Sequence, residues 1–253
     1  MINDPLFYLV GLPAALIFGV SKGGLGGGLG VLAVPLMSLV MTPAQAAGIL
    51  LPMLLVLDLA GLKAYWRQWD LTSLTALTMA ALAGIALGGL AFGLVSADLT
   101  RLLVGCIAVA FSAWYFFTLW RAPVAAQKPA GHSLAGAAAA GAMSGFTSTL
   151  AHAGGPPVTM YLLRRKLPQA QFVATTVALF FFINLAKVVP YALLGQFSQE
   201  NLKAGAVLAP TGLLGIWLGI RLQQRLSQVR FYRICYALLA LVGLRLIASG
   251  LGY

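Results

Sequence analysis

The first residues of this chain that could do chemistry lie in a glycine-rich stretch, Ser21-Lys22-Gly23-Gly24-Leu25-Gly26-Gly27-Gly28. Glycine carries no side chain, so an anion can approach the backbone N–H groups closely. The ammonium group of Lys22 would add a full positive charge, and an ionisable residue among apolar segments is a functional candidate by default. We therefore expect an anion to bind at Ser21, Lys22, Gly26, Gly27 and Gly28. Two alternatives stay open: the glycines could serve only close helix packing, and Lys22 could extend its chain to water.

A second stretch of this kind runs from Thr147 to Pro157, and its candidate ligands are Ser148, Thr149, His152, Gly154 and Gly155. Hydroxyl, imidazole and backbone N–H groups all donate hydrogen bonds to oxyanions. A lone histidine is as often structural, so the role of His152 stays open. Ser148 and His152 could also form a nucleophile and base in an intramembrane hydrolase. However, the chain has no Gly-x-Ser-x-Gly elbow, no paired carboxylates, no metal-ligand spacing and no nucleotide-binding loop ending. We expect no enzyme activity, no metal and no cofactor.

Three more polar residues interrupt apolar stretches. Asp58 and Asn184 stand at matching places 126 residues apart, in Asp58-Leu-Ala and Asn184-Leu-Ala. Lys187 follows Asn184 by three positions and would share its helix face. We expect Asn184 and Lys187 to contribute to the substrate site. Asp58 is a candidate carrier of a coupling proton, and pairing with a lysine is the other interpretation.

The composition sets the environment of these residues. Sixty per cent of the 253 residues are hydrophobic and 8% are charged, whereas soluble domains carry about 25% charged residues. Apolar runs of about 20 residues, the length that a bilayer requires, recur along the chain. The net charge of +11 is typical of basic loops on the cytoplasmic side of a membrane rather than of nucleic-acid binding. The composition therefore predicts an integral membrane protein, with helical spans because only helices or closed barrels satisfy the backbone in lipid.

An internal repeat divides the chain. Pro43-Ala-Gln-Ala parallels Pro168-Gln-Ala-Gln, and Gly84-Ile-Ala-Leu-Gly88 parallels Gly215-Ile-Trp-Leu-Gly219; these last glycines fit helix packing. We predict an all-α polytopic membrane protein with two inverted repeats, each a re-entrant helical hairpin plus three transmembrane helices. The first repeat is 1–121 (hairpin 6–41, helices 43–64, 71–95 and 99–120). A cytoplasmic linker, 122–131, joins it to the second repeat, 132–253 (hairpin 133–165, helices 168–194, 202–222 and 231–249).

The hairpins are predicted because their arms are short. Leu6–Val20 has 15 residues and Leu29–Met41 has 13, and neither crosses a hydrocarbon core of about 30 Å at about 1.5 Å per residue. We expect the returning arms to begin near Gly28 and at Pro156, with their N-termini aimed at the membrane midplane. Non-helical backbone there survives only beside protein or a wet cavity, and paired broken segments typically mark a transporter site.

The basic residues favour inverted halves. With eight simple crossings, Lys and Arg outside the broken loops and span interiors divide eight to six. With re-entrant hairpins each half crosses three times, and the division becomes eleven to three, as the positive-inside bias requires. The larger group is Lys63, Arg67, Arg121, Lys128, Arg164, Arg165, Lys166, Arg221, Arg225, Arg230 and Arg233, and the smaller is Arg101, Lys203 and Arg245. Both termini are then expected outside.

The stretch from Gly19 to Pro35, the motif Pro43-Ala-Gln-Ala-Ala-Gly and the stretch from Gly145 to Gly155 resemble the TauE/SafE sulfite exporter family. This family is also called the TSUP, or toluene-sulfonate uptake permease, family. The resemblance covers nearly the whole chain and implies a substrate such as sulfite, thiosulfate or an organosulfonate like sulfoacetate. The segment Thr147–Ala153 stands where family members are typically richer in glycine. The exact substrate and the direction of transport are therefore left open.

The resulting functional prediction is a secondary transporter of a small sulfur-containing anion, bound between the two broken hairpins. A passive anion channel is the main alternative, and an intramembrane hydrolase is the lesser one. The expected partners are the anion and the lipid bilayer, without nucleic acid. The expected location is a bacterial inner membrane. The coupling ion and the oligomeric state, a homodimer included, stay open.

Overall fold

The computed structural model of the protein describes residues 4–24, 30–120, 131–222 and 228–252. All regular structure within these ranges is helical, with ten α-helices and one 3-10 helix. They are α1 (Pro5–Gly24), η1 (Gly30–Leu32), α2 (Ala33–Met37), α3 (Pro43–Ala64), α4 (Leu71–Leu94), α5 (Ala97–Trp120), α6 (Leu134–Ala151), α7 (Gly155–Arg165), α8 (Gln169–Leu193), α9 (Gln199–Leu222) and α10 (Gln228–Gly250). In the described ranges seven helices, α1, α3, α4, α5, α8, α9 and α10, are long and apolar enough to cross a membrane. The all-helical membrane architecture is confirmed.

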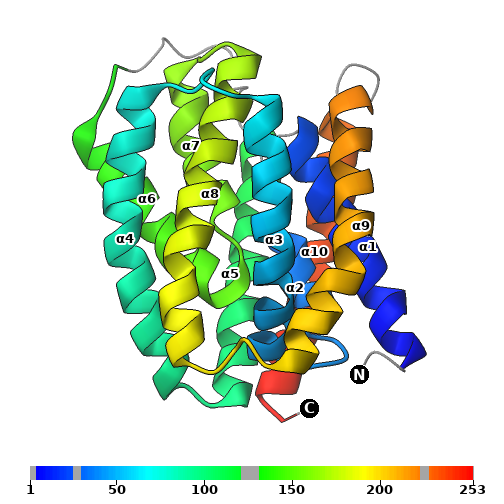
Figure 1. Ribbon diagram of the computed structural model, residues 1–253. Helices are drawn as coiled ribbons and strands as arrows, with labels where there is room; N and C mark the ends of the chain where they lie inside the picture. The colour runs from blue at the N-terminus through cyan, green and yellow to red at the C-terminus, as the bar shows by residue number, and fades with distance from the viewer. Residues whose placement is uncertain (1–3, 25–29, 121–130, 223–227, 253) are drawn as a thin grey trace.

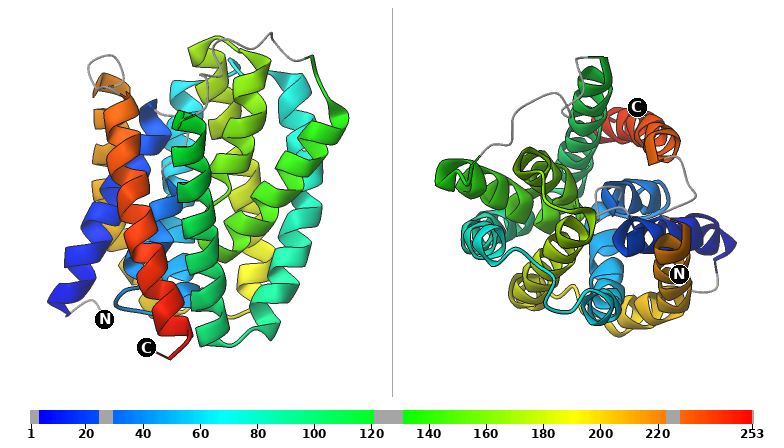
Figure 2. Two further views of the ribbon diagram at one scale, coloured as in Figure 1. Left: turned by 180° about the vertical axis from the view of Figure 1, so that it is seen from behind. Right: turned by 90° about the horizontal axis from the view of Figure 1, so that it is seen from above.

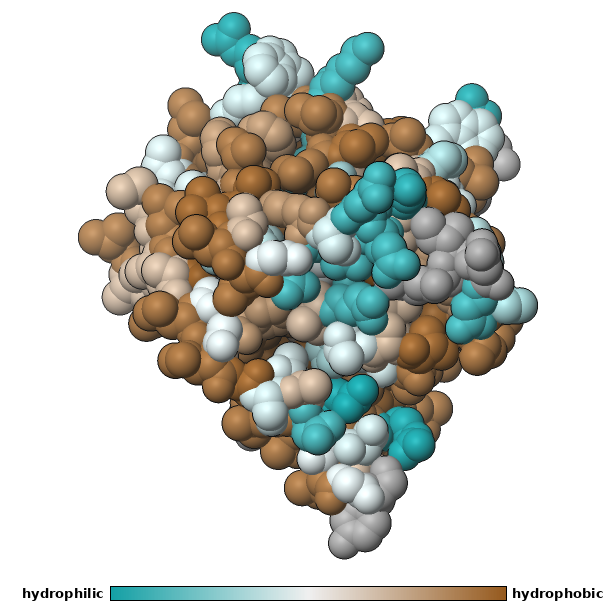
Figure 3. Space-filling view, turned by 60° about the horizontal axis from the view of Figure 1, so that its bottom comes forward, coloured by the Kyte–Doolittle hydropathy of each residue, from teal (hydrophilic) through white to brown (hydrophobic). Residues whose placement is uncertain are grey.

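The helices stand side by side in one bundle with polar ends. Helices α1 and α3 both begin at the lower end of Figure 1, whereas α6 and α8 both begin at the upper end. The start of α1 and the end of α10 are both at the lower end of the bundle. Seen from above, α5 and α10 form a pair at one side of the bundle (Figure 2). Hydrophilic residues gather on the end face that comes forward in Figure 3, and hydrophobic side chains surround them.

Glycines allow two helix pairs to pack at backbone distance, α1 against α9 and α4 against α6. A Cβ atom added to Gly84 would lie 2.0 Å from the Ala142 carbonyl oxygen, and one on Gly215 would lie 2.6 Å from the Leu16 oxygen. Such distances leave no room for any side chain. The packing interpretation of these two glycines is therefore correct, in agreement with small residues at membrane helix interfaces.

The first hairpin differs from its prediction. Helix α1 does not stop at Val20 but continues through Ser21, Lys22, Gly23 and Gly24, so its 20 residues make it a candidate span. Glycine in a helix costs about 1 kcal/mol relative to alanine. Here close packing requires it, because a Cβ on Gly23 would lie 2.3 Å from the Ile216 oxygen of α9. In the described part of the returning arm, η1 and α2 cover residues 30–37, so its helix ends four residues before the predicted Met41.

The second hairpin agrees more closely with its prediction. Helix α6 extends three residues beyond Ser148 to Ala151, and α7 begins at Gly155, one residue before Pro156. The backbone turns at His152, which adopts a left-handed conformation with φ of 49°. The turn is held locally, because the hydroxyl of Thr147 lies 3.0 Å from the carbonyl oxygen of Ala153. A chain break is therefore present within the predicted stretch from Thr147 to Pro157.

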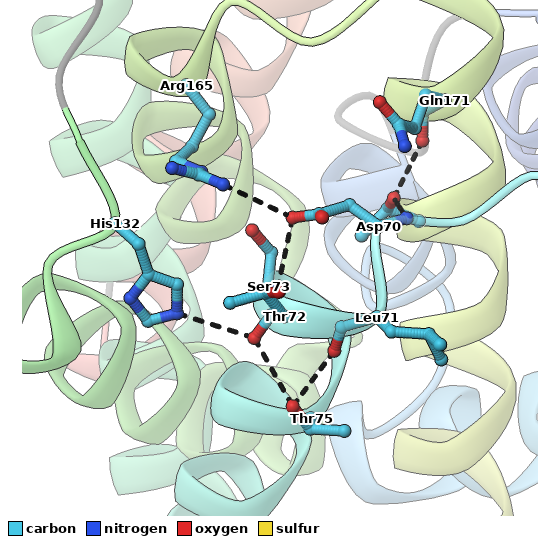
Figure 4. A network of polar contacts seen from close by, with 9 residues as sticks. Asp70, Leu71, Thr72, Ser73, Thr75, His132, Arg165 and Gln171 are labelled. Carbon is cyan, nitrogen blue, oxygen red and sulfur yellow. Dashed lines mark hydrogen bonds and ion pairs between the residues drawn. The ribbon is translucent and has the colours of Figure 1, made fainter.

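Asp70 ties the ends of three helices together (Figure 4). As the N-cap of α4, its carboxylate accepts a hydrogen bond from the Ser73 N–H at 3.1 Å. The Arg165 guanidinium at the end of α7 lies 3.6 Å from the same oxygen. The Asp70 N–H donates to the Thr175 hydroxyl of α8 at 2.9 Å. Partial burial alone would raise the pKa of Asp70, but the hydrogen bonds from Ser73 and the charge of Arg165 outweigh it and hold the pKa below its ordinary value.

This network predicts a pH-dependent contribution to stability. Asparagine caps helices as well as aspartate does, so Asp70→Asn removes mainly the carboxylate charge. A carboxyl group with a depressed folded-state pKa adds stability above its unfolded pKa of about 3.9 and loses it as the pH falls through the depressed value. Asp70→Asn should therefore lower the thermal unfolding temperature at pH 7, and the difference should close below about pH 4. A difference of the same size at pH 7 and pH 3 would show that the charge of Asp70 contributes nothing.

Candidate functional site

A buried polar cluster lies between α1, α3, α8 and the connection from α6 to α7. The Lys22 ammonium on α1 forms a buried salt bridge with one carboxylate oxygen of Asp58 on α3. The other oxygen of Asp58 accepts a hydrogen bond from the Asn184 amide of α8 at 2.7 Å. Lys22 and Asn184 are each 2% exposed, and Asp58 is fully buried. Of the two interpretations of Asp58, pairing with a lysine is present in the structure.

The second lysine of the cluster contacts neutral groups. The Lys187 ammonium lies 3.0 Å from the Ser148 hydroxyl, 3.2 Å from the Ser148 carbonyl oxygen and 2.6 Å from Nδ1 of His152. Nε2 of His152 lies 3.0 Å from the Ala47 carbonyl oxygen. A carbonyl only accepts and an ammonium only donates, so Nε2 carries the hydrogen and Nδ1 accepts. His152 is then a neutral imidazole that holds Lys187 in place.

The cluster has an excess of positive charge. Its described ionisable groups are two ammonium ions, Lys22 and Lys187, one carboxylate, Asp58, and a neutral imidazole. Charges removed from water are costly unless they are paired. With both lysines protonated, the described groups carry one net positive charge, and an anion among these residues would compensate it. The chemistry of the cluster favours anion binding.

A small cavity lies beside the cluster and is lined by Phe18, Lys22, Leu54, Ser148, His152, Gly155, Phe180 and Asn184. Its volume is about 10 Å³, close to the minimum that holds one water molecule. Its lining combines polar residues with apolar side chains from α1, α3 and α8. A larger anion would have to move these helices apart before it could occupy the cavity.

The chain break beside the cavity has clear local causes. Gly154 precedes α7, and a Cβ atom there would lie 2.6 Å from the Ser144 hydroxyl and 2.8 Å from the Ser144 carbonyl oxygen. Gly154 is therefore required by packing. Pro156 and Pro157 in the first turn of α7 have no N–H group, so this helix start offers fewer backbone donors than an ordinary one. The positive charge next to the cavity comes mainly from the lysines.

The structure brings together most of the candidate residues that it describes. Six of them, Lys22, Asp58, Ser148, His152, Asn184 and Lys187, form the hydrogen-bonded cluster, and Gly155 lines the cavity. Thr149 instead donates its hydroxyl to the Gly145 carbonyl oxygen at 2.8 Å and contacts α4. Ser21 is buried in α1. Gly26, Gly27 and Gly28 lie outside the described residues.

Aromatic residues of the site were not predicted from the sequence. Tyr191 on α8 is fully buried, donates its hydroxyl to the Thr149 carbonyl oxygen at 2.7 Å, and has its ring centre 6.0 Å from the Lys187 nitrogen. Phe18 on α1 has its ring centre 5.8 Å from the Lys22 nitrogen. Each aromatic residue stands four positions from its lysine. This spacing on one helix face was the signal that could have identified them.

The fold and the cluster together define a polytopic helical membrane protein of the transporter class, with broken helices around a buried ionisable site. Among known families, the one described as sulfite exporter TauE/SafE matches residues 11–246 of the chain. The chain therefore belongs to the TauE/SafE family, whose members are membrane transporters rather than enzymes. The resemblance noted in its glycine-rich motifs is confirmed. No curated protein and no solved structure is significantly similar to the chain.

The charges of Lys22 and Asp58 predict that removing Asp58 alone destabilises the protein more than removing both residues' charges together. Asp58→Asn removes the carboxylate and leaves two buried ammonium groups without a counter-ion. Breaking a buried pair in this way should destabilise the protein by about 3–5 kcal/mol, measured as reduced thermal stability in detergent. The double variant Lys22→Met/Asp58→Asn should recover most of the loss. Parent-like stability of Asp58→Asn would mean that Lys22 and Asp58 are not both ionised.

Proposed function

We propose that this protein is a secondary transporter of a small sulfur-containing anion, which binds at the cluster between the two broken hairpins. The observation that carries the proposal is a buried site with two lysines, Lys22 and Lys187, and a single carboxylate, Asp58. Membership of the TauE/SafE family supports a sulfur anion, in the class of sulfite, thiosulfate or sulfoacetate. The Ser148 hydroxyl and the Asn184 amide would complete the polar lining.

Opposite helix directions support the proposal that the halves are inverted repeats. Helix α1 begins at the lower end of the bundle and its counterpart α6 at the upper end. The packing is reciprocal as well. Helix α1 packs on α9, the counterpart of α4 in the second half, and α6 packs on α4 itself. Each half thus places its first helix against the same element of its partner.

The glycine contacts repeat this reciprocity at single positions. A Cβ on Gly19 would lie 2.1 Å from the Gly212 oxygen, and one on Gly145 would lie 2.1 Å from the Ala81 oxygen. Gly19 and Gly145 are 126 residues apart, and Ala81 and Gly212 are 131 apart. The same offsets separate Asp58 from Asn184 and Gly84 from Gly215. Such agreement supports repeats over 1–121 and 132–253, joined by 122–131.

Binding of a sulfur anion should depend on Lys187. Lys187→Met keeps much of the side chain's length and removes the charge, so the described cluster becomes neutral. A charged buried hydrogen bond contributes roughly 1.5–3 kcal/mol, and its loss should weaken binding about ten- to a hundred-fold. The measurement is calorimetric titration of purified protein with sulfite, thiosulfate, sulfate, sulfoacetate and taurine. Lys203→Met, at an exposed position of α9, is the matched control and should bind as the parent does.

Flux into proteoliposomes separates a transporter from a channel. A transporter should show saturable uptake that is accelerated when unlabelled substrate is present inside, because loaded carriers exchange. Uptake that rises linearly with concentration would support the passive anion channel. Failure of every sulfur anion to bind would refute the proposed function.

The proposed inverted arrangement also predicts which loops face the outside of the cell. In a chain with Cys106 and Cys235 replaced by serine, we expect Ala97→Cys and Gln199→Cys to react with an impermeant thiol reagent added outside intact cells. Gln68→Cys, in the basic connection between α3 and α4, should be protected, since positive loops face the cytoplasm. All three positions are exposed. Labelling of residue 68 together with protection of residue 97 would reverse the proposed orientation.

A further inference from the structure

Only one of the two polar atoms in the side-chain amide of Asn184 has a hydrogen-bond partner among the described residues. Its nitrogen donates to Asp58 at 2.7 Å, whereas its oxygen is buried and has no hydrogen-bond partner among the described residues. A carboxylate can only accept, so the contact with Asp58 fixes which end of the amide is the nitrogen. The atom without a partner is therefore the amide oxygen, which is a hydrogen-bond acceptor.

The free oxygen belongs to a residue that lines the cavity. Asn184 is 2% exposed and borders the cavity together with Lys22, Ser148 and His152. Leaving a buried polar group unpaired is costly. A molecule that fills this space must therefore supply a donor to the amide oxygen, or the cost persists in the complex. A ligand that displaces a bound water without replacing its hydrogen bonds loses affinity for the same reason.

Two kinds of partner satisfy an amide oxygen: a metal cation, or an N–H or O–H group. The surroundings disfavour the cation. The carboxylate next to Asn184 is already paired with the Lys22 ammonium, and Lys187 adds a second positive charge to the cluster. A cation would enter a region that is already one charge too positive. An anion that carries its own hydrogen-bond donor satisfies both the charge and the amide oxygen.

We propose that the site selects a singly charged sulfur anion that carries an N–H or O–H group, and that this group donates to the side-chain oxygen of Asn184. A single charge balances Lys22, Lys187 and Asp58 when both lysines are protonated. Protonated sulfite and sulfonates with a hydroxyl or amino group belong to this class. The inference rests on the proposed function and narrows its substrate class.

Sulfamate and methanesulfonate test the inference directly. Both are small monoanions with a sulfonate group, and they differ only in an NH2 group in place of a CH3 group. Titration calorimetry of the parent protein should give at least about tenfold tighter binding of sulfamate, since a site built around a polar group rejects the analogue that lacks it. In Asn184→Leu, which is similar in size and has no acceptor, the two affinities should become equal. Loss of the amide donor to Asp58 affects both ligands alike, so the ratio is the readout.

Equal binding of the two anions by the parent would overturn the inference, as would a preference for sulfamate that persists in Asn184→Leu. The comparison in the parent needs no variant, so the inference can fail even where Asn184→Leu does not fold. Binding of sulfite or sulfoacetate without any binding of sulfamate would refute the inference alone. Absence of binding by every sulfur anion would refute the proposed function itself.

Discussion

Two buried lysines accompany one buried carboxylate, and this imbalance is the constraint on which the rest of the structure depends. Asp58 accepts from both Lys22 and Asn184, so it joins α1, α3 and α8 at one point. Lys187 is held by Ser148 and His152 at the chain break of the second hairpin. Each half of the chain therefore contributes one lysine to a common site. In the proposed mechanism, the charge of the second lysine attracts the anion to this site.

The scaffold around this site is held by backbone packing rather than by large side chains. Glycines bring α1 onto α9 and α4 onto α6 at distances that exclude a Cβ atom. Tightly packed contacts of this kind resist sliding, because interiors at high density have few alternative arrangements. The polar cluster lies between these pairs, and its cavity of about 10 Å³ is too small for a sulfonate. A sulfonate could occupy the proposed site only if helices separate at the cluster, where contacts are polar and can exchange with those of the ligand.

The sequence predicted the membrane class and the long helices well, because hydrocarbon thickness and backbone hydrogen bonding restrict the solutions. It also identified Lys22, Asp58, Asn184 and Lys187, since charged and polar residues stand out in apolar helices. The predicted end of α1 at Val20 was wrong. Glycine disfavours a helix, but the close contact of Gly23 with Ile216 of α9 requires glycine there, and the sequence does not reveal this contact. Pairings across the chain, such as Lys187 with His152, depend on tertiary contacts that spacing along one helix does not encode.

The most direct test of the central claim is a structure of the protein with selenite, a heavier analogue of sulfite, located by the anomalous scattering of selenium. A selenium peak within hydrogen-bonding reach of Lys187 and Lys22, beside Ser148 and Asn184, is the result that the account predicts. A peak in the larger cavity between α5, α7 and α8, lined by Tyr115, Thr159 and Phe172 among others, with none at the cluster, would contradict it.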